Sequence, residues 1–433
     1  MPCTYTDVIN CYSGGKKRMY IRALQKLKET GFSKRNAVVK MFVKPDRYPS
    51  EDIKLKDPRA IQYRGPEFNL ELSRYIKAYE HALYDTLIMD VASGTRVIAK
   101  GLNQVERAAL IMEKAAAFND PVFLLFDHSR FDSTINTEHL KSTHKKYQRA
   151  FRSKTLQKYL NFQLKNVGYS QHGIKYKTTA TRMSGDPDTG CGNSIINADV
   201  LWGLFWFSKI KKFDFVLDGD DSIGFVERVD ISKVDLNLFG KFGFDTKHSF
   251  VDNIHQAEFC QSRLILTDPP VMCRNPVRAM SHSQVTRLRY ASHMYPQWLA
   301  AVGLCEMSIN YGVPILQSFG YALSQVSRKK YFDEDYKWKM AGVKERHKPR
   351  PITTKARLSF YEAWGTPPGL QEMIEKMDFT SHLETLIKYK RFKKNFKKNI
   401  VAQHVRTTVS LSTAKAVYRA NDESSGSSWW CCS

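Results

Sequence analysis

The sequence lacks an apolar run of the ~20 residues that a membrane-spanning helix needs. The nearest approach, VLWGLFWF at 200–207, is far too short. The 8 cysteines show no CxxC pairing, and the 12 histidines form no recognisable set of metal ligands. No signal peptide is recognisable either. We therefore expect no transmembrane segment, and reduced thiols in a cytosolic setting.

Acidic residues are also scarce, with 43 Asp and Glu against 67 Lys and Arg, which gives a net charge of +24. Such an excess favours a polyanionic partner, of which nucleic acid is the commonest. The alternative is that the chain is basic without binding any polyanionic partner. The 433 residues, 42% hydrophobic and 25% charged, are typical of a soluble globular chain with a large core, built as two or three domains or as one lobed domain.

Local patterns predict a mixture of helices and strands without an internal repeat. PVFLLFD at 121–127 predicts a buried strand, residues 213–227 a glycine hairpin, and residues 40–64 a loop. The region after about residue 280 is expected to be mostly helical. CYSGGKKRMYIRALQKLKETG is expected to combine a Gly-Gly turn, a basic cluster and a helical stretch closed by Gly31. Further helices are expected in ELSRYIKAYEHALYDTLI, after Thr137, in TGCGNSIINADVLWGLFWF, and in PITTKARLSFYEAWGTPPG with Thr353 or Thr354 as N-cap and Gly365 at its end.

Two short stretches place carboxylates at the ends of apolar runs. LFDHSRFDST carries Asp127 at a strand end and Asp132 on the following turn, and VLDGDDSIGF carries Asp220 and Asp221 beside a glycine turn. Carboxylates packed together repel one another and lose hydration, so bound cations must offset the cost. An oxygen-rich pocket suits Mg²⁺ or Mn²⁺, and two such ions can assist phosphoryl transfer. Gly-Asp-Asp alone also fits a solvated turn.

RMSGDPDTGCGN lies between these two acidic stretches and joins a glycine-containing loop to a helix of small residues. Ser184 and Gly185 would let the backbone approach a nucleotide or template closely. Thr189 and Asn193 would share one helical face and offer a hydroxyl and an amide. An ordinary capped helix is the alternative.

In this order, the motifs resemble those of the RNA-dependent RNA polymerases of positive-strand RNA viruses. DHSRFD is similar to the family's first palm motif, SGDPDTGCGN to its second and GDD to its third. PRAIQYRGPEFNLELSRY resembles the basic fingertip motif of the tombusvirus-like branch, and YSGGKKRMYIRAL the motif at which template enters. EFCQSRLI resembles the primer grip, and TTKARLSFYEAWG a thumb helix. The resemblance covers roughly residues 11 to 370.

The resemblance implies roles for individual residues. Asp127, Asp220 and the accessory Asp221 would hold metal, and Lys247 would protonate pyrophosphate. Lys247 is equally well read as a surface lysine, and the grip residues as structural. The residues that would contact nucleotide are Asp132, Ser184, Gly185, Thr189, Asn193, Lys44, Arg59 and Arg64. Those that would contact template or primer are Lys16, Lys17, Arg18, Cys260 and Gln261.

The implied fold is α+β, a right-hand polymerase with an antiparallel palm sheet. Fingers and fingertips would take residues 1–120, the palm with an inserted finger segment 121–265, a helical thumb 266–400, and a flexible tail 401–433. Partners would be RNA template and product and ribonucleoside triphosphates. Relatives often carry a leading membrane anchor, so either another replicase component supplies it or this chain is part of a longer protein. Localisation would be the host cytoplasm, at membrane-associated replication complexes.

Two other functions fit part of the pattern. A reverse transcriptase also pairs strand-end aspartates, but the combination of Asp132 and Asn193 favours ribonucleotides. A non-catalytic RNA-binding subunit would keep the fold, but every expected metal carboxylate is present. The basic segment KYKRFKKNFKK at 388–398 would add nonspecific RNA affinity, or would be an amphipathic helix with a solvated basic face.

Overall fold

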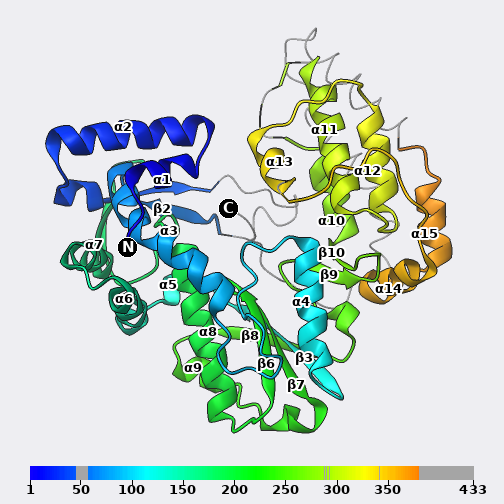
Figure 1. The fold of residues 1–433 in the computed structure, drawn as a ribbon, viewed down its shortest axis with the longest axis horizontal. Helices are drawn as coiled ribbons and strands as arrows, with labels where there is room; N and C mark the ends of the chain where they lie inside the picture. Colours follow the sequence, from blue (N-terminus) through cyan, green and yellow to red (C-terminus); the bar gives the residue numbers. More distant parts are fainter. Residues whose placement is uncertain (45–56, 287, 289, 292, 341, 380–433) are drawn as a thin grey trace. The chain divides into compact units, whose positions relative to one another are not determined.

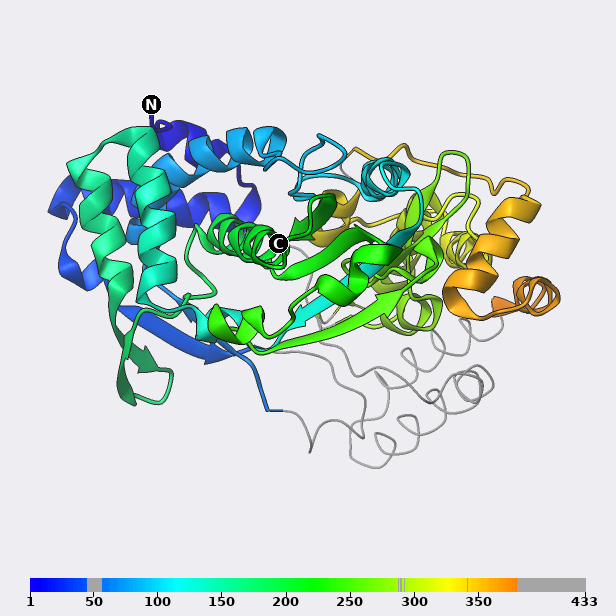
Figure 2. The same ribbon diagram turned by 90° about the horizontal axis from the view of Figure 1, so that it is seen from below.

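The computed structural model describes residues 1–44, 57–286, 288, 290–291, 293–340 and 342–379 (Figures 1 and 2). These residues form two units, each of which combines two stretches of the chain. The first unit contains Met1–Lys100 and Phe126–Ser249, and the second contains Gly101–Leu125 and the described residues from Phe250 onward. The chain mixes helices and strands, as the α+β prediction requires.

A four-stranded sheet with the order β6-β7-β3-β8 carries the acidic stretches. Its strands are β3 (Pro121–His128), β6 (Phe213–Asp218), β7 (Asp221–Glu227) and β8 (Thr246–Val251). All six residues of β6 (FDFVLD) are buried, including Asp214 and Asp218. The segment 91–99 covers the outer edge of β6 through backbone hydrogen bonds such as Ala99 N to Leu217 O, so this edge is not left open.

A second sheet corrects the prediction that residues 40–64 form a loop. Its order is β2-β1-β4-β5, with strands β1 (Val39–Val43), β2 (Ala60–Tyr63), β4 (Lys165–Ser170) and β5 (Lys175–Thr179). β1 pairs antiparallel with β2 and parallel with β4, which lies far along the chain. Lys, Pro and Asp residues around β1 and β2 weaken the local signal for strands, and β1 also pairs with the distant strand β4.

The helices of the first unit agree with the predicted ones where predictions were made. α2, α3, α6 and α8 confirm the four expected helices, and Gly31 ends α2 with φ +68°. The expected Gly-Gly turn is wrong, because Gly14 and Gly15 are the first two residues of α2. In Figure 1, α8 lies beside β6, and the two elements are in contact. The elements are α1 (Tyr5–Asn10), α2 (Gly14–Thr30), η1 (Lys34–Ala37), α3 (Pro66–Thr86), α5 (Phe131–Thr134), α6 (Thr137–Phe151), α7 (Lys154–Leu164), α8 (Thr189–Phe207), η2 (Arg228–Lys233) and α9 (Leu238–Lys241).

The second unit is mostly helical, as expected for the region after about residue 280. Its elements are α4 (Gln104–Ala116), η3 (Ile254–Gln256), β9 (Ser262–Ile265), β10 (Val271–Arg274), α10 (Pro276–Ser283), α11 (Met294–Ile309), α12 (Leu316–Gln325), α13 (Glu334–Lys339), α14 (Thr354–Trp364) and α15 (Pro368–Glu375). α11 and α12 pack closely because Gly303 and Gly320 lie at their contact, where an added Cβ would lie 2.3 and 2.5 Å from backbone nitrogen atoms.

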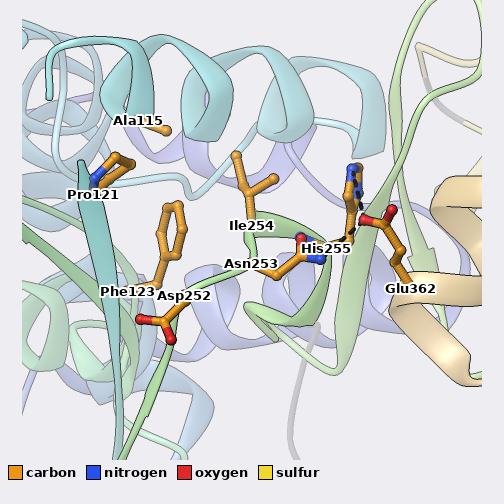
Figure 3. A pocket seen from close by; sticks show the side chains of 8 residues that line it. All are labelled: Ala115, Pro121, Phe123, Asp252, Asn253, Ile254, His255 and Glu362. Carbon is orange, nitrogen blue, oxygen red and sulfur yellow. Dashed lines mark hydrogen bonds and ion pairs between the residues drawn. The ribbon is translucent and has the colours of Figure 1, made fainter. Parts of the chain in front are cut away.

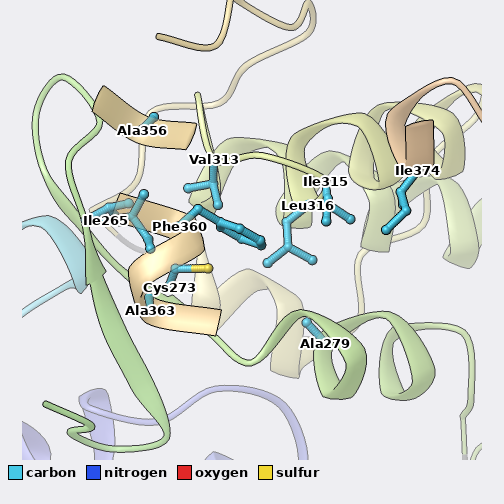
Figure 4. Close-up of a cluster of buried hydrophobic side chains, with 11 residues drawn as sticks. Ile265, Cys273, Ala279, Val313, Ile315, Leu316, Ala356, Phe360, Ala363 and Ile374 are labelled. Carbon is cyan, nitrogen blue, oxygen red and sulfur yellow. The ribbon is translucent and has the colours of Figure 1, made fainter. Parts of the chain in front are cut away.

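Phe360 of α14 lies in a buried cluster of the second unit (Figure 4). It is fully buried and shares the cluster with Ile265 of β9 and Cys273 of β10. The caps of α14 confirm the predicted punctuation: the Thr353 side chain accepts from Ala356 N, and Gly365 closes the helix in the left-handed conformation.

The six cysteines that the structure describes are free thiols. Within the same residues, every helix is too short or too polar to cross a membrane. The basic segment 388–398 and the tail 401–433 lie outside the described residues.

Candidate active site

The hairpin between β6 and β7 presents Asp220 at its tip. Asp218 and Asp221 are paired across the two strands, so Gly219 and Asp220 form a two-residue turn. Gly219 has φ +71°, a conformation that glycine adopts without steric cost. The positive φ of this turn therefore accounts for the glycine of Gly-Asp-Asp.

The carboxylates from the two acidic stretches share one electrostatic environment. The pKa of Asp220 is raised to about 6, first by burial and then by the negative charges of Asp132, Asp127 and Asp218. The structure thus brings the end of β3, the short helix α5 and the hairpin tip together. Lys100 forms an ion pair with Asp218, with 2.9 Å between Nζ and Oδ1.

The donor set suits a hard divalent cation, although it does not form a complete coordination shell. Among the described residues, no three carboxylate, histidine or cysteine side chains are arranged to hold a metal ion. Burial and the neighbouring negative charges both raise the pKa of Asp220. Carboxylate oxygens are the ligands that Mg²⁺ and Mn²⁺ prefer, so the residues fit such an ion by chemistry and charge.

Asp132 and Asn193, which the sequence predicts to meet at the sugar, are hydrogen-bonded to each other. Asn193 Nδ2 donates to Asp132 Oδ1 at 2.7 Å, although the residues are 61 positions apart. Burial raises the pKa of Asp132, and the bond from Asn193 and the charge of Arg182 oppose this rise. The amide and the carboxylate are therefore held at one place, beside the acidic hairpin.

The sequence prediction missed Arg182, which hydrogen-bonds to Asn193 of this pair. Its Nε donates to Asn193 Oδ1 at 3.2 Å, and its Nη1 lies 2.6 Å from Asp188 Oδ2. Arg182 is buried, so losing Asp188 would remove the carboxylate that pairs directly with its charge. Gly192 makes room for the guanidinium, since a Cβ there would lie 2.3 Å from Arg182 Nη2. Arg182, two residues before Ser184 in RMSGDPDT, was the available signal.

The loop that contains Ser184 and Gly185 lies against β2. Gly185 N donates to Gln62 O at 2.7 Å, and Gln62 N donates to Ser184 Oγ at 3.1 Å. A Cβ at Gly185 would lie 2.5 Å from Tyr63 Cβ, so only glycine fits. Thr189 donates its hydroxyl to the carbonyls of Met183 and Asp186. The predicted close approach at Gly185 is therefore an approach to β2.

Arg64 has a structural role in this conformation. It is 1% exposed, and its Nε forms two bonds of 2.9 and 3.1 Å with Asp186. Its other nitrogen atoms donate to Ala37 O and Asn166 Oδ1. The arginine thereby braces the loop before α8 against β4 and η1. The predicted contact with triphosphate would require these bonds to break, because no nitrogen atom of Arg64 reaches the surface.

The other basic candidates lie on separate elements. Lys44 and Arg59 flank β1 and β2 and share a backbone hydrogen bond of 2.7 Å. Lys247 is exposed on β8. Near the start of α2, Lys17 donates to Asn10, Lys16 lies 4.5 Å from the centre of the Tyr12 ring, and Arg18 is exposed.

Cys260 and Gln261 belong to the second unit, where they form a tight turn. Their φ angles are +49° and +58°, and Phe259 and Ser262 exchange two backbone hydrogen bonds across them. Two consecutive left-handed residues are the pattern of a type I′ hairpin turn, which is usually made by Asn or Gly. The geometry therefore gives these two residues a backbone role.

Three further polar residues around the hairpin were missed by the sequence prediction. Ser194 and Asn197 of α8 bond to the backbone of Gly219, and His128 of β3 bonds to Asn197. Burial lowers the pKa of His128 to about 4, so its imidazole is neutral at physiological pH. Asn197 within the apolar stretch IINADVLWG was the available signal.

The second unit contains a surface pocket of about 520 Å³ (Figure 3). Glu362 accepts a hydrogen bond from Asn253 at 2.9 Å, and its carboxylate lies 3.9 Å from His255 Nε2. The other ring nitrogen of His255 donates to Leu264 O. No residue of this pocket was among the predicted site residues.

Comparison with known proteins identifies the class to which this fold and site belong. Residues 1–385 match the family model described as viral RNA-dependent RNA polymerase, and the chain belongs to this family. This membership confirms the resemblance seen in the palm motifs.

Particular relatives are RNA-directed RNA polymerases of plant viruses. The chain is 32% identical over 399 residues to that of Tobacco necrosis virus (strain A), with 88% of this chain and 55% of the relative covered. The identity to the Turnip crinkle virus enzyme is 31% over 387 residues, covering 84% and 49%. For the Carnation mottle virus enzyme it is 30% over 388 residues, covering 85% and 50%. The chain spans about half the length of these curated relatives.

Proposed function

We propose that this chain carries the RNA-directed RNA polymerase activity of a viral replicase. The reaction would add ribonucleoside monophosphates to an RNA 3′ hydroxyl, directed by an RNA template, with release of pyrophosphate. The observation that carries the proposal is the shared electrostatic environment of Asp127, Asp132 and Asp220 in a chain of this family. The net charge of +24 supports the binding of template and product backbones.

Each carboxylate has a distinct task in this proposal. Asp127 and Asp220 would hold divalent cations, Mg²⁺ with Mn²⁺ as substitute, and Asp221 would be an accessory ligand. Bound cations supply activation of the attacking hydroxyl and stabilisation of the departing phosphate oxygen. With its pKa at about 6, Asp220 is ionised at physiological pH and available as a ligand.

The Asp132–Asn193 pair would recognise the ribose. A 2′ hydroxyl can donate to the carboxylate and accept from the amide, so it matches both groups. The bond of 2.7 Å between the two side chains, supported by Arg182, keeps them in place before substrate arrives. Such preorganisation lowers the entropic cost of binding the correct sugar.

We further propose the right-hand architecture, with fingers at 1–120, palm at 121–265, thumb at 266–400 and a tail at 401–433. The acidic hairpin and strand of the first unit suit a palm, and the predominance of helices after β10 suits a thumb. Membrane attachment at replication complexes in the host cytoplasm would come from other replicase components or from further parts of a longer protein.

Primer extension on a homopolymeric RNA template with Mg²⁺ or Mn²⁺ tests the activity. Wild type should extend with NTPs, and Asp220→Asn should not, while its RNA affinity stays within about twofold of wild type. Asp90→Asn, at an exposed position after α3, is the matched control and should extend normally. Extension with dNTPs alone would favour a reverse transcriptase. Binding of RNA without extension under any condition would favour a non-catalytic subunit.

A further inference from the structure

The turn that carries Asp220 is held by α8 through both polar groups of Gly219. Gly219 N donates to Ser194 Oγ at 3.1 Å, and Gly219 O accepts from Asn197 Nδ2 at 3.0 Å. These bonds fix the peptide groups on either side of Gly219, the residue directly before Asp220. A single helix therefore sets the position of the hairpin tip.

The same asparagine also contacts β3, next to Asp127. Since the amide nitrogen of Asn197 is committed to Gly219 O, its Oδ1 faces His128 Nε2, 3.2 Å away. His128 Nε2 must then carry the proton and donate, and its Nδ1 accepts from the hydroxyl of Thr246 at 2.7 Å. The hydrogen-bond network assigns this tautomer. Asn197 thus joins the strand of Asp127 to the turn of Asp220.

The three side chains that form the network are buried, so bulk water does not readily replace their bonds. Ser194 and Asn197 are fully buried, and His128 is 4% exposed. An unpaired polar group in such a place costs about 1–3 kcal/mol, which favours one arrangement of the three elements. One turn before Asn197 on the same helix, Asn193 holds Asp132. The side chains of α8 therefore reach all three elements that carry the acidic residues.

We propose that Asn197, together with His128, is a positioning residue that sets the separation of Asp127 and Asp220. The proposal rests on the function proposed above, because it assigns to these two carboxylates the task of holding cations. Without the clamp formed by Ser194, Asn197 and His128, the hairpin tip and the end of β3 move independently, and cations are held less tightly.

The test compares Asn197→Leu with Asn310→Leu, a matched substitution in the second unit. Asn310 is also buried, and its amide donates to Glu306 at 2.8 Å, so both variants lose a buried amide of the same size. Two properties are measured: primer extension as a function of NTP and Mg²⁺ concentration, and the rise in Tm that Mg²⁺ causes in the absence of substrate.

For Asn197→Leu we expect kcat to fall roughly 10- to 100-fold, the size of effect that a displacement of about 1 Å produces. The NTP KM should change less than about threefold, the half-saturating Mg²⁺ concentration should rise several-fold, and the Mg²⁺-induced rise in Tm should shrink. Asn310→Leu should lower the Tm of the metal-free protein. It should leave kcat, the NTP KM, the half-saturating Mg²⁺ concentration and the Mg²⁺-induced rise in Tm unchanged. His128→Leu combined with Asn197→Leu should lose no more activity than the worse single variant, since the two residues act as one unit.

Different results separate the two proposals. An Asn197→Leu protein with the kcat and Mg²⁺ dependence of wild type overturns the positioning role. Equal changes in Asn197→Leu and Asn310→Leu would also overturn it, because they would reflect general loss of packing. Wild type that extends no RNA primer overturns the proposed function instead. In that case the Mg²⁺-induced rise in Tm still decides whether Asn197 supports cation binding.

Discussion

Asp220→Asn should stabilise the metal-free protein at neutral pH even though it removes activity. Asp220 loses its proton at about pH 6 in the folded chain, whereas its ordinary value is 3.8. The folded state therefore binds this proton more tightly than the unfolded state does. Stability falls as pH rises between about 4 and 6, and the loss persists above pH 6. Asparagine has nearly the same shape as aspartate but carries no charge, so Asp220→Asn avoids this loss of stability.

The magnitude follows from the two pKa values. Their difference, at about 1.4 kcal/mol for each pH unit, corresponds to an upper limit of roughly 3 kcal/mol. Asp220 is partly exposed and water screens its charge, so we expect a gain of roughly 1–3 kcal/mol. The Asn side chain can still accept the backbone hydrogen bond that Asp220 accepts, so little is lost in exchange.

Thermal unfolding without divalent ions, measured at intervals from pH 4 to pH 8, tests this reasoning. The Tm difference between Asp220→Asn and wild type should be near zero at pH 4 and should reach its maximum above pH 6. Asp90→Asn should show no such trend, and added Mg²⁺ should raise the Tm of wild type more than that of Asp220→Asn. A difference that is flat with pH, or a variant less stable than wild type at pH 7, would refute the electrostatic argument.

Other variants test separate parts of the structure. Asn193→Asp or Asp132→Ala should lower the ratio of kcat/KM for ATP to that for dATP by the equivalent of about 1–3 kcal/mol, and equal losses for both substrates would refute sugar selection. Gly185→Ala should reduce Tm and activity together, because its Cβ would overlap β2, and wild-type Tm would contradict the contact. Phe360→Ala should cost roughly 3–5 kcal/mol in urea unfolding, and a cost under about 1 kcal/mol would contradict its burial. Replacing four lysines in 388–398 should flatten the salt dependence of RNA binding by a few units of slope, whereas an unchanged slope favours the amphipathic helix.

The elements that the sequence predicted correctly are those with local signals. The hairpin at 213–227 follows from two apolar runs around a glycine, and α14 follows from Thr353 and Gly365 at its ends. The prediction failed at β1 and β2. These strands are short and flanked by charged residues, and β1 acquires a parallel partner only when β4 folds against it. No local pattern contains that partner.

The sequence alone determined the acidic residues, their order along the chain, and the strand ends and turn that present them, because turn chemistry and hydrophobic periodicity act over a few residues. Only the tertiary structure decided how those residues meet. The bond between Asp132 and Asn193, the burial of Arg64 against Asp186, and the network of His128, Asn197 and Gly219 join residues far apart in sequence. Such contacts form only because packing excludes water and leaves each polar group one available partner.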